Sequence, residues 1–324
     1  MTFGVLSNFL YSVNAVVPIV LLVALGFFLR RIGFLTDEFT SVGESVVFKA
    51  ALPALLFLDV AGGDLSTALS HGDLVVYCIV TVTATFLLSS LLVPLILKDR
   101  RQCGAFVQGM CRSNFAVLGI PLAENMFGES GLAAVAVVMP FVILMFNAYS
   151  VIVLSAFEPK EERAAPGQTA LSILKNIVTN PLIIAVILAL PLMIWHIELP
   201  TVLDKSIGYL GDLATPLALI CLGANFKPET IRGNLKCVLF SSLGKIVLLP
   251  AVFVTLAALL GFRGEALGVI LILFGAPSAV SSYIMARKMK SDAELAAQIM
   301  LTTTMFCVFT IFAGIFILRS FNLI

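Results

Sequence analysis

Charged residues are scarce in this chain. Lys, Arg, Asp and Glu make up 12% of its 324 residues, whereas soluble domains carry roughly 25%. Apolar residues make up 60% and come in long blocks, for example at 13–29 and 177–194. A hydrocarbon core about 30 Å thick requires about 20 apolar residues in each spanning helix. The composition therefore excludes a soluble domain and predicts an all-α polytopic protein embedded in a lipid bilayer.

Several kinds of functional motif are also missing. His71 and His196 are not spaced as metal ligands, and the six cysteines form no C-x-x-C pair, so packing inside apolar stretches is their expected role. The 20 basic and 19 acidic residues leave no charge excess for nucleic acid. No P-loop, G-x-S-x-G or G-x-G-x-x-G motif occurs. We therefore expect no enzymatic activity, metal, cofactor or nucleic-acid partner.

Apolar runs between polar breaks predict ten transmembrane helices. Their ranges are 11–29, 40–60, 73–97, 104–126, 130–156, 177–196, 206–225, 236–260, 265–286 and 293–318. The longest connection, 158–176, contains Pro159, Pro166 and several charges. It predicts a linker between two halves, 1–157 and 177–324.

Basic residues gather in alternate loops. One side of the membrane receives Arg30, Arg31, Lys98, Arg100, Arg101, Lys160, Arg163, Lys175, Lys227, Arg232, Lys236, Arg287, Lys288 and Lys290. The other side receives Lys205, Arg263 and Arg319. Because basic loops stay in the cytoplasm, we expect a cytoplasmic linker and two external termini in the inner (plasma) membrane.

Prolines recur at matching positions of the two halves. The pairs are Pro18 with Pro181 and Pro53 with Pro216, 163 residues apart, and Pro94 with Pro250 and Pro121 with Pro277, 156 residues apart. A seven-residue difference located in loops explains the two offsets. An odd number of spans per half orients the copies oppositely, so the pattern predicts two inverted five-helix repeats, an architecture of secondary transporters.

Two tripeptides should interrupt their helices, Gly119–Ile120–Pro121 in the fourth span and Gly275–Ala276–Pro277 in the ninth. Proline removes a backbone donor and glycine weakens a helix, and lipid cannot satisfy the freed carbonyls. Half-helices beginning at Pro121 and Pro277 would direct two positive dipole ends at one region, which suits an anion. An ordinary proline kink is the alternative for either proline alone.

Polar residues near these breaks are candidate ligands. We predict that Asn114 binds substrate, and a helix–helix hydrogen bond is the alternative. Ser278 and Ser281 are also predicted to bind substrate, with helix packing as the alternative. Leu52 would contact the substrate's carbon skeleton. Arg112 is interpreted as a snorkelling side chain near a cytoplasmic vestibule.

Ionisable residues within spans are usually functional, and Glu44, Lys49, Glu124 and Asp212 are candidates for coupling. Lys49 and Asp212 each stand four residues before a repeat-matched proline, so they either pair or titrate. Coupling to protons is favoured because no compact sodium cage is evident. Sodium held by serine hydroxyls and backbone carbonyls is the alternative. Lys245 is interpreted as a snorkelling residue at the interface.

These motifs resemble the auxin efflux carrier family along essentially the whole chain. Asn114–Phe–Ala–Val–Leu–Gly119–Ile–Pro121–Leu is similar to its N-x4-G-I-P-L crossover sequence. Further matches are Val17–Pro18, Phe48-x4-Pro53–Ala–Leu–Leu–Phe57, Asn180–Pro181, Asp212 with Leu222–Gly223, and Pro277 with Tyr283–Ile–Met–Ala–Arg287. The resemblance implies crossover helices four and nine, and a transport domain of helices 3–5 and 8–10 that moves against a scaffold of helices 1, 2, 6 and 7.

The resemblance also implies the substrate class. The chain lacks the long central insert of the plant carriers and has Ser113 where they carry proline. Compact bacterial relatives are associated with malate and malonate, so we expect secondary transport of a small carboxylate, an auxin-like acid being less natural. The alternatives are a sodium/proton exchanger of the same plan and a membrane-embedded enzyme or sensor. A homodimer is compatible with the sequence.

The loop charges make a direct prediction about topology. A cysteine introduced by Gln168→Cys should react with a membrane-impermeant maleimide only after the cells are opened, because the linker is cytoplasmic. Labelling of position 168 from outside intact cells would reverse the assigned orientation.

Overall fold

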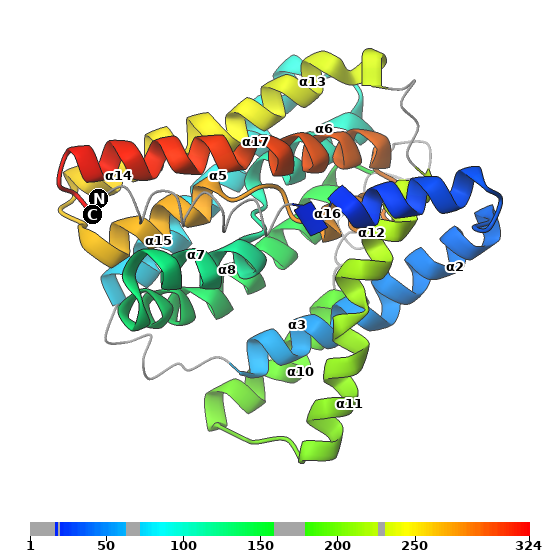
Figure 1. The fold of residues 1–324 in the computed structure, drawn as a ribbon, viewed down its shortest axis with the longest axis horizontal. Helices are drawn as coiled ribbons and strands as arrows, with labels where there is room; N and C mark the ends of the chain where they lie inside the picture. Colours follow the sequence, from blue (N-terminus) through cyan, green and yellow to red (C-terminus); the bar gives the residue numbers. More distant parts are fainter. Residues whose placement is uncertain (1–16, 19, 63–71, 159–178, 226–230) are drawn as a thin grey trace, which may run out of the picture.

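The computed structural model describes residues 17–18, 20–62, 72–158, 179–225 and 231–324, and every regular element among them is helical (Figure 1). In chain order the elements are α2 (Asp37–Val46), η1 (Val47–Ala51), α3 (Leu52–Ala61), α5 (Gly72–Ile96), α6 (Arg100–Cys111), α7 (Phe115–Phe127), α8 (Glu129–Ala156), α10 (Pro181–Trp195), α11 (Thr201–Asp212), α12 (Ala214–Asn225), α13 (Ile231–Leu243), η4 (Gly244–Leu248), α14 (Leu249–Leu259), α15 (Gly264–Gly275), α16 (Ser281–Lys288) and α17 (Ala293–Ser320). The prediction of an all-helical protein is confirmed for this part of the chain.

Six continuous helices in the described ranges are long and apolar enough to cross a membrane. They are Asp37–Ala61, Gly72–Ile96, Glu129–Ala156, Thr201–Asn225, Leu235–Leu259 and Ala293–Ser320. They overlap the expected second, third, fifth, seventh, eighth and tenth spans. The sixth corresponds to the shorter α10. The first lies partly outside the described residues, as does almost all of the linker 158–176. The count of ten crossings and the inversion of the two halves stay predictions.

The fourth and ninth spans each consist of two helices. The ninth leaves its helix after Gly275 and resumes at Ser281, so an interruption at Pro277 is present. In the fourth span the expected break at Pro121 is wrong, because α7 runs through this proline and the helix is broken at Arg112–Asn114.

The position of this break follows from where hydrogen-bond partners are available. The Asn114 amide donates to the Pro277 carbonyl, N···O 2.8 Å, so the extended segment is paired with the other break. A proline inside a helix frees few backbone groups, which neighbouring helices in a membrane can accommodate.

Two other prolines distort their helices without breaking them. The π-helical turns η1 and η4 lie directly before Pro53 and Pro250, and each closes with an i to i−5 bond, from Leu52 to Val47 and from Leu249 to Gly244. Proline cannot donate to its own helix, so the ladder shifts by one residue upstream of it. Lys49 and Lys245 lie in these turns.

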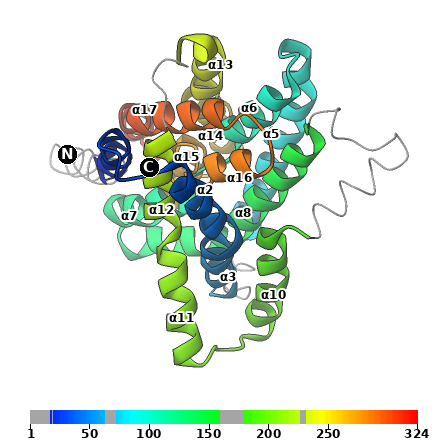
Figure 2. The same ribbon diagram turned by 90° about the vertical axis from the view of Figure 1, so that its right-hand side faces the viewer.

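The helices pack in two groups. In the first, α3 contacts α10 and α11, and α2 contacts α12; Figure 2 shows α10 and α11 extending away from the other helices. In the second, α5 contacts α6 and α8, α7 contacts α15, and α17 contacts α6, α13 and α16. The groups meet where α16 touches α2, η1 and α12, and where α3 touches α8.

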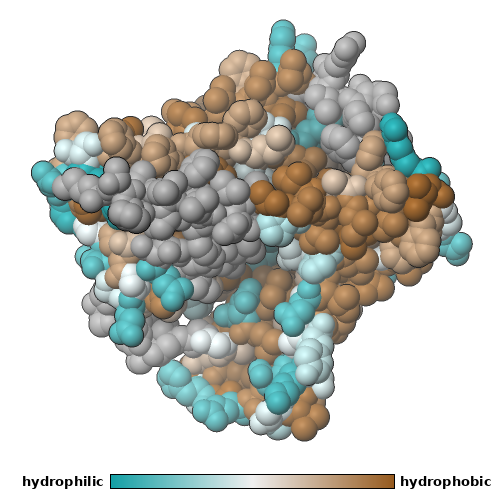
Figure 3. All heavy atoms as spheres, viewed as in Figure 1, coloured by the Kyte–Doolittle hydropathy of each residue, from teal (hydrophilic) through white to brown (hydrophobic). Residues whose placement is uncertain are grey.

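The surface is apolar over wide areas. Figure 3 shows hydrophobic residues along the upper and right-hand parts of one face. Leu95 and Ile96 of α5 and Phe309 of α17 are more than half exposed. Exposed patches of this extent are unusual in soluble monomers and match a surface that faces lipid.

The helix formed by residues 20–31 crosses α12 at two glycines. A Cβ atom on Gly223 would overlap the Val23 carbonyl, and one on Gly26 would overlap the Ile220 carbonyl. Small residues permit this close backbone contact between membrane helices. A larger residue at either position would force the two helices apart.

Gly223→Ala should therefore lower the melting temperature of the purified protein, even though alanine is intrinsically the better helix former by about 1 kcal/mol. Gly208→Ala on α11 is the matched control, because its Cβ would meet only the Leu58 Cδ1 atom at 3.8 Å. Equal melting temperatures for the two variants would show that the crossing tolerates a side chain.

Candidate functional site

A cavity of about 90 Å³ lies between the two broken spans and the first helix group. Its lining residues are Leu52, Leu55, Leu56, Asp59, Arg112, Ser113, Asn114, Ile143, Phe146, Asn147, Ala214, Thr215, Ala218, Ala279, Val280 and Ser281. The residues of α3 follow helical spacing and form one wall. Residues 112–114 and 279–281, from the two breaks, form another part of the lining.

Two helices begin at this cavity. Asn114 is the residue before α7, and Val280 is the residue before α16. A helix N-terminus carries partial positive charge from its unpaired amides. Two helix N-termini therefore meet at one cavity, as the sequence predicted, but they begin at Phe115 and Ser281 instead of Pro121 and Pro277.

Arg112 is the principal charged group of the cavity, and only 5% of it is exposed. Its Nη2 atom donates to Asn147 Oδ1 at 2.8 Å and to Ser281 Oγ at 2.6 Å, and Nη1 contacts the sulfur of Met285. Asn147 in turn donates to the Ile143 carbonyl at 2.8 Å, which directs its oxygen toward the arginine. The interpretation of Arg112 as a snorkelling residue is wrong, because its side chain turns inward to these partners.

No carboxylate pairs with Arg112 in the described part of the chain. The ion pairs found there join Arg30 to Asp37, and Arg287 and Lys288 to Glu44. A buried charge whose partners are all neutral is unfavourable by several kcal/mol relative to a paired one. The Arg112 guanidinium is thus without a direct ion pair in a cavity whose lining also includes the acidic Asp59.

A second cation is buried in the other helix group. Lys245 is fully buried, and its Nζ atom donates to the Phe274 carbonyl at 3.1 Å. That carbonyl belongs to the last turn of α15, where the helix dipole favours a positive charge. The assignment of Lys245 to the membrane interface is therefore wrong, since η4, which carries it, is packed against α6, α15 and α17.

Three serine hydroxyls around the breaks have no hydrogen-bond partner within the described residues. Ser113 lines the cavity and is 5% exposed, and its Oγ atom is unpaired. Ser278 and Ser282 are fully buried with unpaired Oγ atoms, although the Ser278 amide donates to Thr303 Oγ1 at 3.0 Å. Buried polar atoms are normally satisfied, so the Ser113 hydroxyl is available to a ligand.

The structure brings together part of the predicted site. Leu52, Asn114 and Ser281 line the cavity. Pro277 takes part through its carbonyl, which accepts from Asn114. Ser278 lies outside the lining, as do the three residues 119–121, which belong to α7.

Sequence reasoning missed Asp59 and Asn147, and it misjudged Arg112. An arginine next to Asn114 inside an apolar span was itself a usable signal, because ionisable residues at that depth mark functional sites. Asn147 gave less warning, since a single asparagine in an apolar helix also serves helix packing.

Glu44 lies in a polar cluster at the boundary of the helix groups. It is 2% exposed and its Oε1 atom accepts from Tyr283 Oη at 2.6 Å and from Asn225 Nδ2 at 2.9 Å. Arg287 Nε and Lys288 Nζ lie 3.7 and 3.8 Å from its Oε2 atom. We call these five residues the Glu44 cluster. The cluster links α2 and α12 to α16. Glu44 precedes Leu52 by eight residues, which is about 12 Å along a helix.

The remaining candidates for coupling lie elsewhere. Lys49, Glu124 and Asp212 are exposed. Lys49 and Asp212 do not form an ion pair among the described residues, so the paired arrangement is absent.

Comparison with known proteins identifies relatives along most of the chain. A family model described as membrane transport protein matches residues 11–313. An uncharacterized transporter of Methanocaldococcus jannaschii is 26% identical over 92% of this chain and 96% of its own length. A proposed malonate transporter of Rhizobium meliloti is 24% identical over 94% of this chain and 95% of its own length. Auxin efflux carrier component 3 of Arabidopsis thaliana is 25% identical over 36% of this chain and 18% of its own length.

Proposed function

Since this chain belongs to the membrane transport protein family that includes the auxin efflux carriers, we propose that it is a secondary transporter of a small organic anion. The anion binds in the cavity beside Arg112. The observation that carries this proposal is the buried guanidinium whose described partners are an amide oxygen, a hydroxyl and a thioether.

The cavity supplies the groups that a carboxylate requires. A carboxylate would replace Ser281 and Asn147 as acceptor for Arg112, forming charge-assisted hydrogen bonds. The side-chain amide of Asn114 and the Ser113 hydroxyl would donate from the first break. The N-termini of α7 and α16 add positive potential without the desolvation of a further cation.

The size of the cavity favours a short substrate. At about 90 Å³, the cavity is smaller than the pockets of drug-sized ligands, which occupy about 300–1,000 Å³. This suits malonate or malate better than an acid with an indole ring. The malonate assignment of the Rhizobium meliloti relative supports the same choice.

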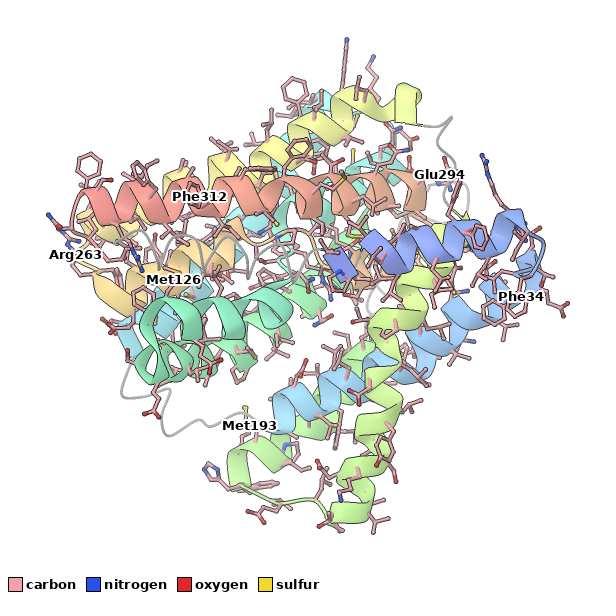
Figure 4. The ribbon with its side chains drawn as sticks, viewed as in Figure 1. Phe34, Met126, Met193, Arg263, Glu294 and Phe312 are labelled. Carbon is pink, nitrogen blue, oxygen red and sulfur yellow. The ribbon has the colours of Figure 1, made fainter. Side chains whose placement is uncertain are left out.

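The transport mechanism is alternating access in a membrane protein of ten crossings and two inverted repeats. The first helix group corresponds to the scaffold, and the second to the moving domain. Arg263 lies at one end of the molecule, and Phe34 lies at the opposite end (Figure 4). This separation supports opposite sides of the membrane for the Arg263 loop and the Arg30–Arg31 loop. The distribution of basic residues makes the Arg30–Arg31 side cytoplasmic and the termini external, in the plasma membrane.

The Glu44 cluster closes the cytoplasmic end of the cavity in this state. Its members on α2 and α12 are in the scaffold, whereas Tyr283, Arg287 and Lys288 are on α16 of the moving domain. Movement of α16 past the scaffold must break these contacts. Glu44 thereby acts in gating.

Glu44→Gln should weaken this closure, because the amide keeps the size of the carboxylate and loses its charge. A probe cysteine at Thr215, in the cavity lining, should then react faster with an impermeant maleimide in inside-out vesicles. The background lacks native cysteines, and Glu38→Gln on the exposed start of α2 is the control. An unchanged labelling rate in Glu44→Gln would remove the cluster from gating.

Binding of malonate should depend on two residues of the first break, Arg112 and Asn114. Hydrogen bonds to charged groups contribute about 1.5–3 kcal/mol, so Arg112→Met and Asn114→Ala should each weaken binding at least tenfold, given that about 1.4 kcal/mol is tenfold. Arg112→Lys should restore binding incompletely, since lysine lacks the planar fork of arginine.

Affinity is measured by calorimetry on purified protein with normal melting behaviour, and Arg163→Ala in the linker serves as the control. If Arg112→Met binds malonate as tightly as the wild type, the cavity is not the anion site.

A further inference from the structure

Asp59 brings a negative charge into the same cavity. It lies on the α3 face that also carries Leu52, Leu55 and Leu56, and all four line the cavity. Asp59 is seven residues beyond Leu52, which is about 10 Å along the helix axis. One end of the cavity wall is therefore apolar and the other is acidic.

Asp59 has no bonding partner among the residues that the structure describes. It belongs to none of the ion pairs there, so its carboxylate does not reach within 4.0 Å of the Arg112 guanidinium. Arg112 is instead bonded to Asn147 and Ser281. The cation and the acid thus line one cavity without a direct ion pair between them.

Other charged groups around α3 do not take this role. On α11, which packs against α3, Asp204, Lys205 and Asp212 are exposed, and Lys49 of η1 is exposed as well. His196, Glu198 and Asp204 line a separate cavity at the end of α3. Helix α10 contains no charged residue, and α8 has Glu129 only at its start. Within the cavity itself, Arg112 is the charged group facing Asp59.

This arrangement constrains the second polar group of a substrate. When one carboxylate occupies Arg112, the rest of the molecule extends along the α3 wall toward Asp59. A second ionised carboxylate there would meet a like charge, and two carboxylates that share a site retain a proton. A hydroxyl or a protonated carboxyl would instead donate to Asp59.

We propose that Asp59 makes the site bind a dicarboxylate together with one proton, held between the Asp59 carboxylate and the second carboxyl of the substrate. The inference rests on the proposed anion site at Arg112 and adds its selectivity for charge. Each transported dicarboxylate then carries one proton through the membrane. The carboxylates that sequence reasoning favoured for proton coupling, Glu44, Glu124 and Asp212, are not needed for this step.

The test counts protons taken up on binding. Calorimetry of the purified full-length protein in buffers of different ionisation enthalpy gives the number bound with malonate and with monomethyl malonate, which has one carboxylate blocked. At about pH 8 the wild type should take up about one proton with malonate, and its affinity should fall about tenfold for each further pH unit. Monomethyl malonate should bind without proton uptake.

Substitution of the acid separates its role from a structural one. Asp59→Asn should bind malonate with almost no proton uptake and little dependence on pH, because the amide can donate to the second carboxylate. Asp59→Glu keeps the acid and should retain the proton uptake. It provides a second variant at this position if Asp59→Asn does not fold. Asp204→Asn, outside the cavity, is the matched control and should behave as the wild type.

The experiment distinguishes failure of the Asp59 proposal from failure of the proposed anion site. Equal proton uptake by Asp59→Asn and the wild type, with malonate bound to both, would overturn the role of Asp59 and leave the anion site standing. Failure of the wild type to bind both malonate and its monomethyl ester would overturn the proposed function, and this inference with it.

Discussion

The constraint on which the site depends is the burial of Arg112 without a direct ion pair to any described carboxylate. Moving such a charge out of water is unfavourable by several kcal/mol unless other groups replace the water. Here Asn147, Ser281 and Met285 partly do so. The interruption at Arg112–Asn114 ends α6, and the cavity beside it leaves room for an anion next to the guanidinium.

The two broken spans also connect the cavity to the Glu44 cluster. The Asn114 amide binds the Pro277 carbonyl, so the breaks are held together. Directly after the second break, α16 carries Ser281, which contacts Arg112, and Tyr283, which contacts Glu44. A shift of α16 would therefore change the contacts of Arg112 and of Glu44 at once, as the proposed alternating access requires.

Periodic and local features of the fold could be predicted from the sequence. Long apolar runs indicated the membrane helices, and Pro277 marked one break. The first break was misplaced because its position depends on a hydrogen bond to a residue more than 160 positions away, whereas Pro121 is a local signal. Arg112 and Lys245 were misjudged for a similar reason. Whether a long cation snorkels or turns inward is decided by the helices around it. Leu52, Asn114 and Ser281 were chosen because they lie near the prolines of the second, fourth and ninth spans. All three line the cavity, and their role in binding stays a prediction.

The central claim is that Arg112 binds the transported anion. The most direct measurement is an experimental structure of the purified protein with malonate bound. It should show a carboxylate oxygen within about 3 Å of a guanidinium nitrogen of Arg112, with the Ser281 contact displaced or shared. Malonate bound elsewhere, with Arg112 still held by Asn147 and Ser281 alone, would contradict the account.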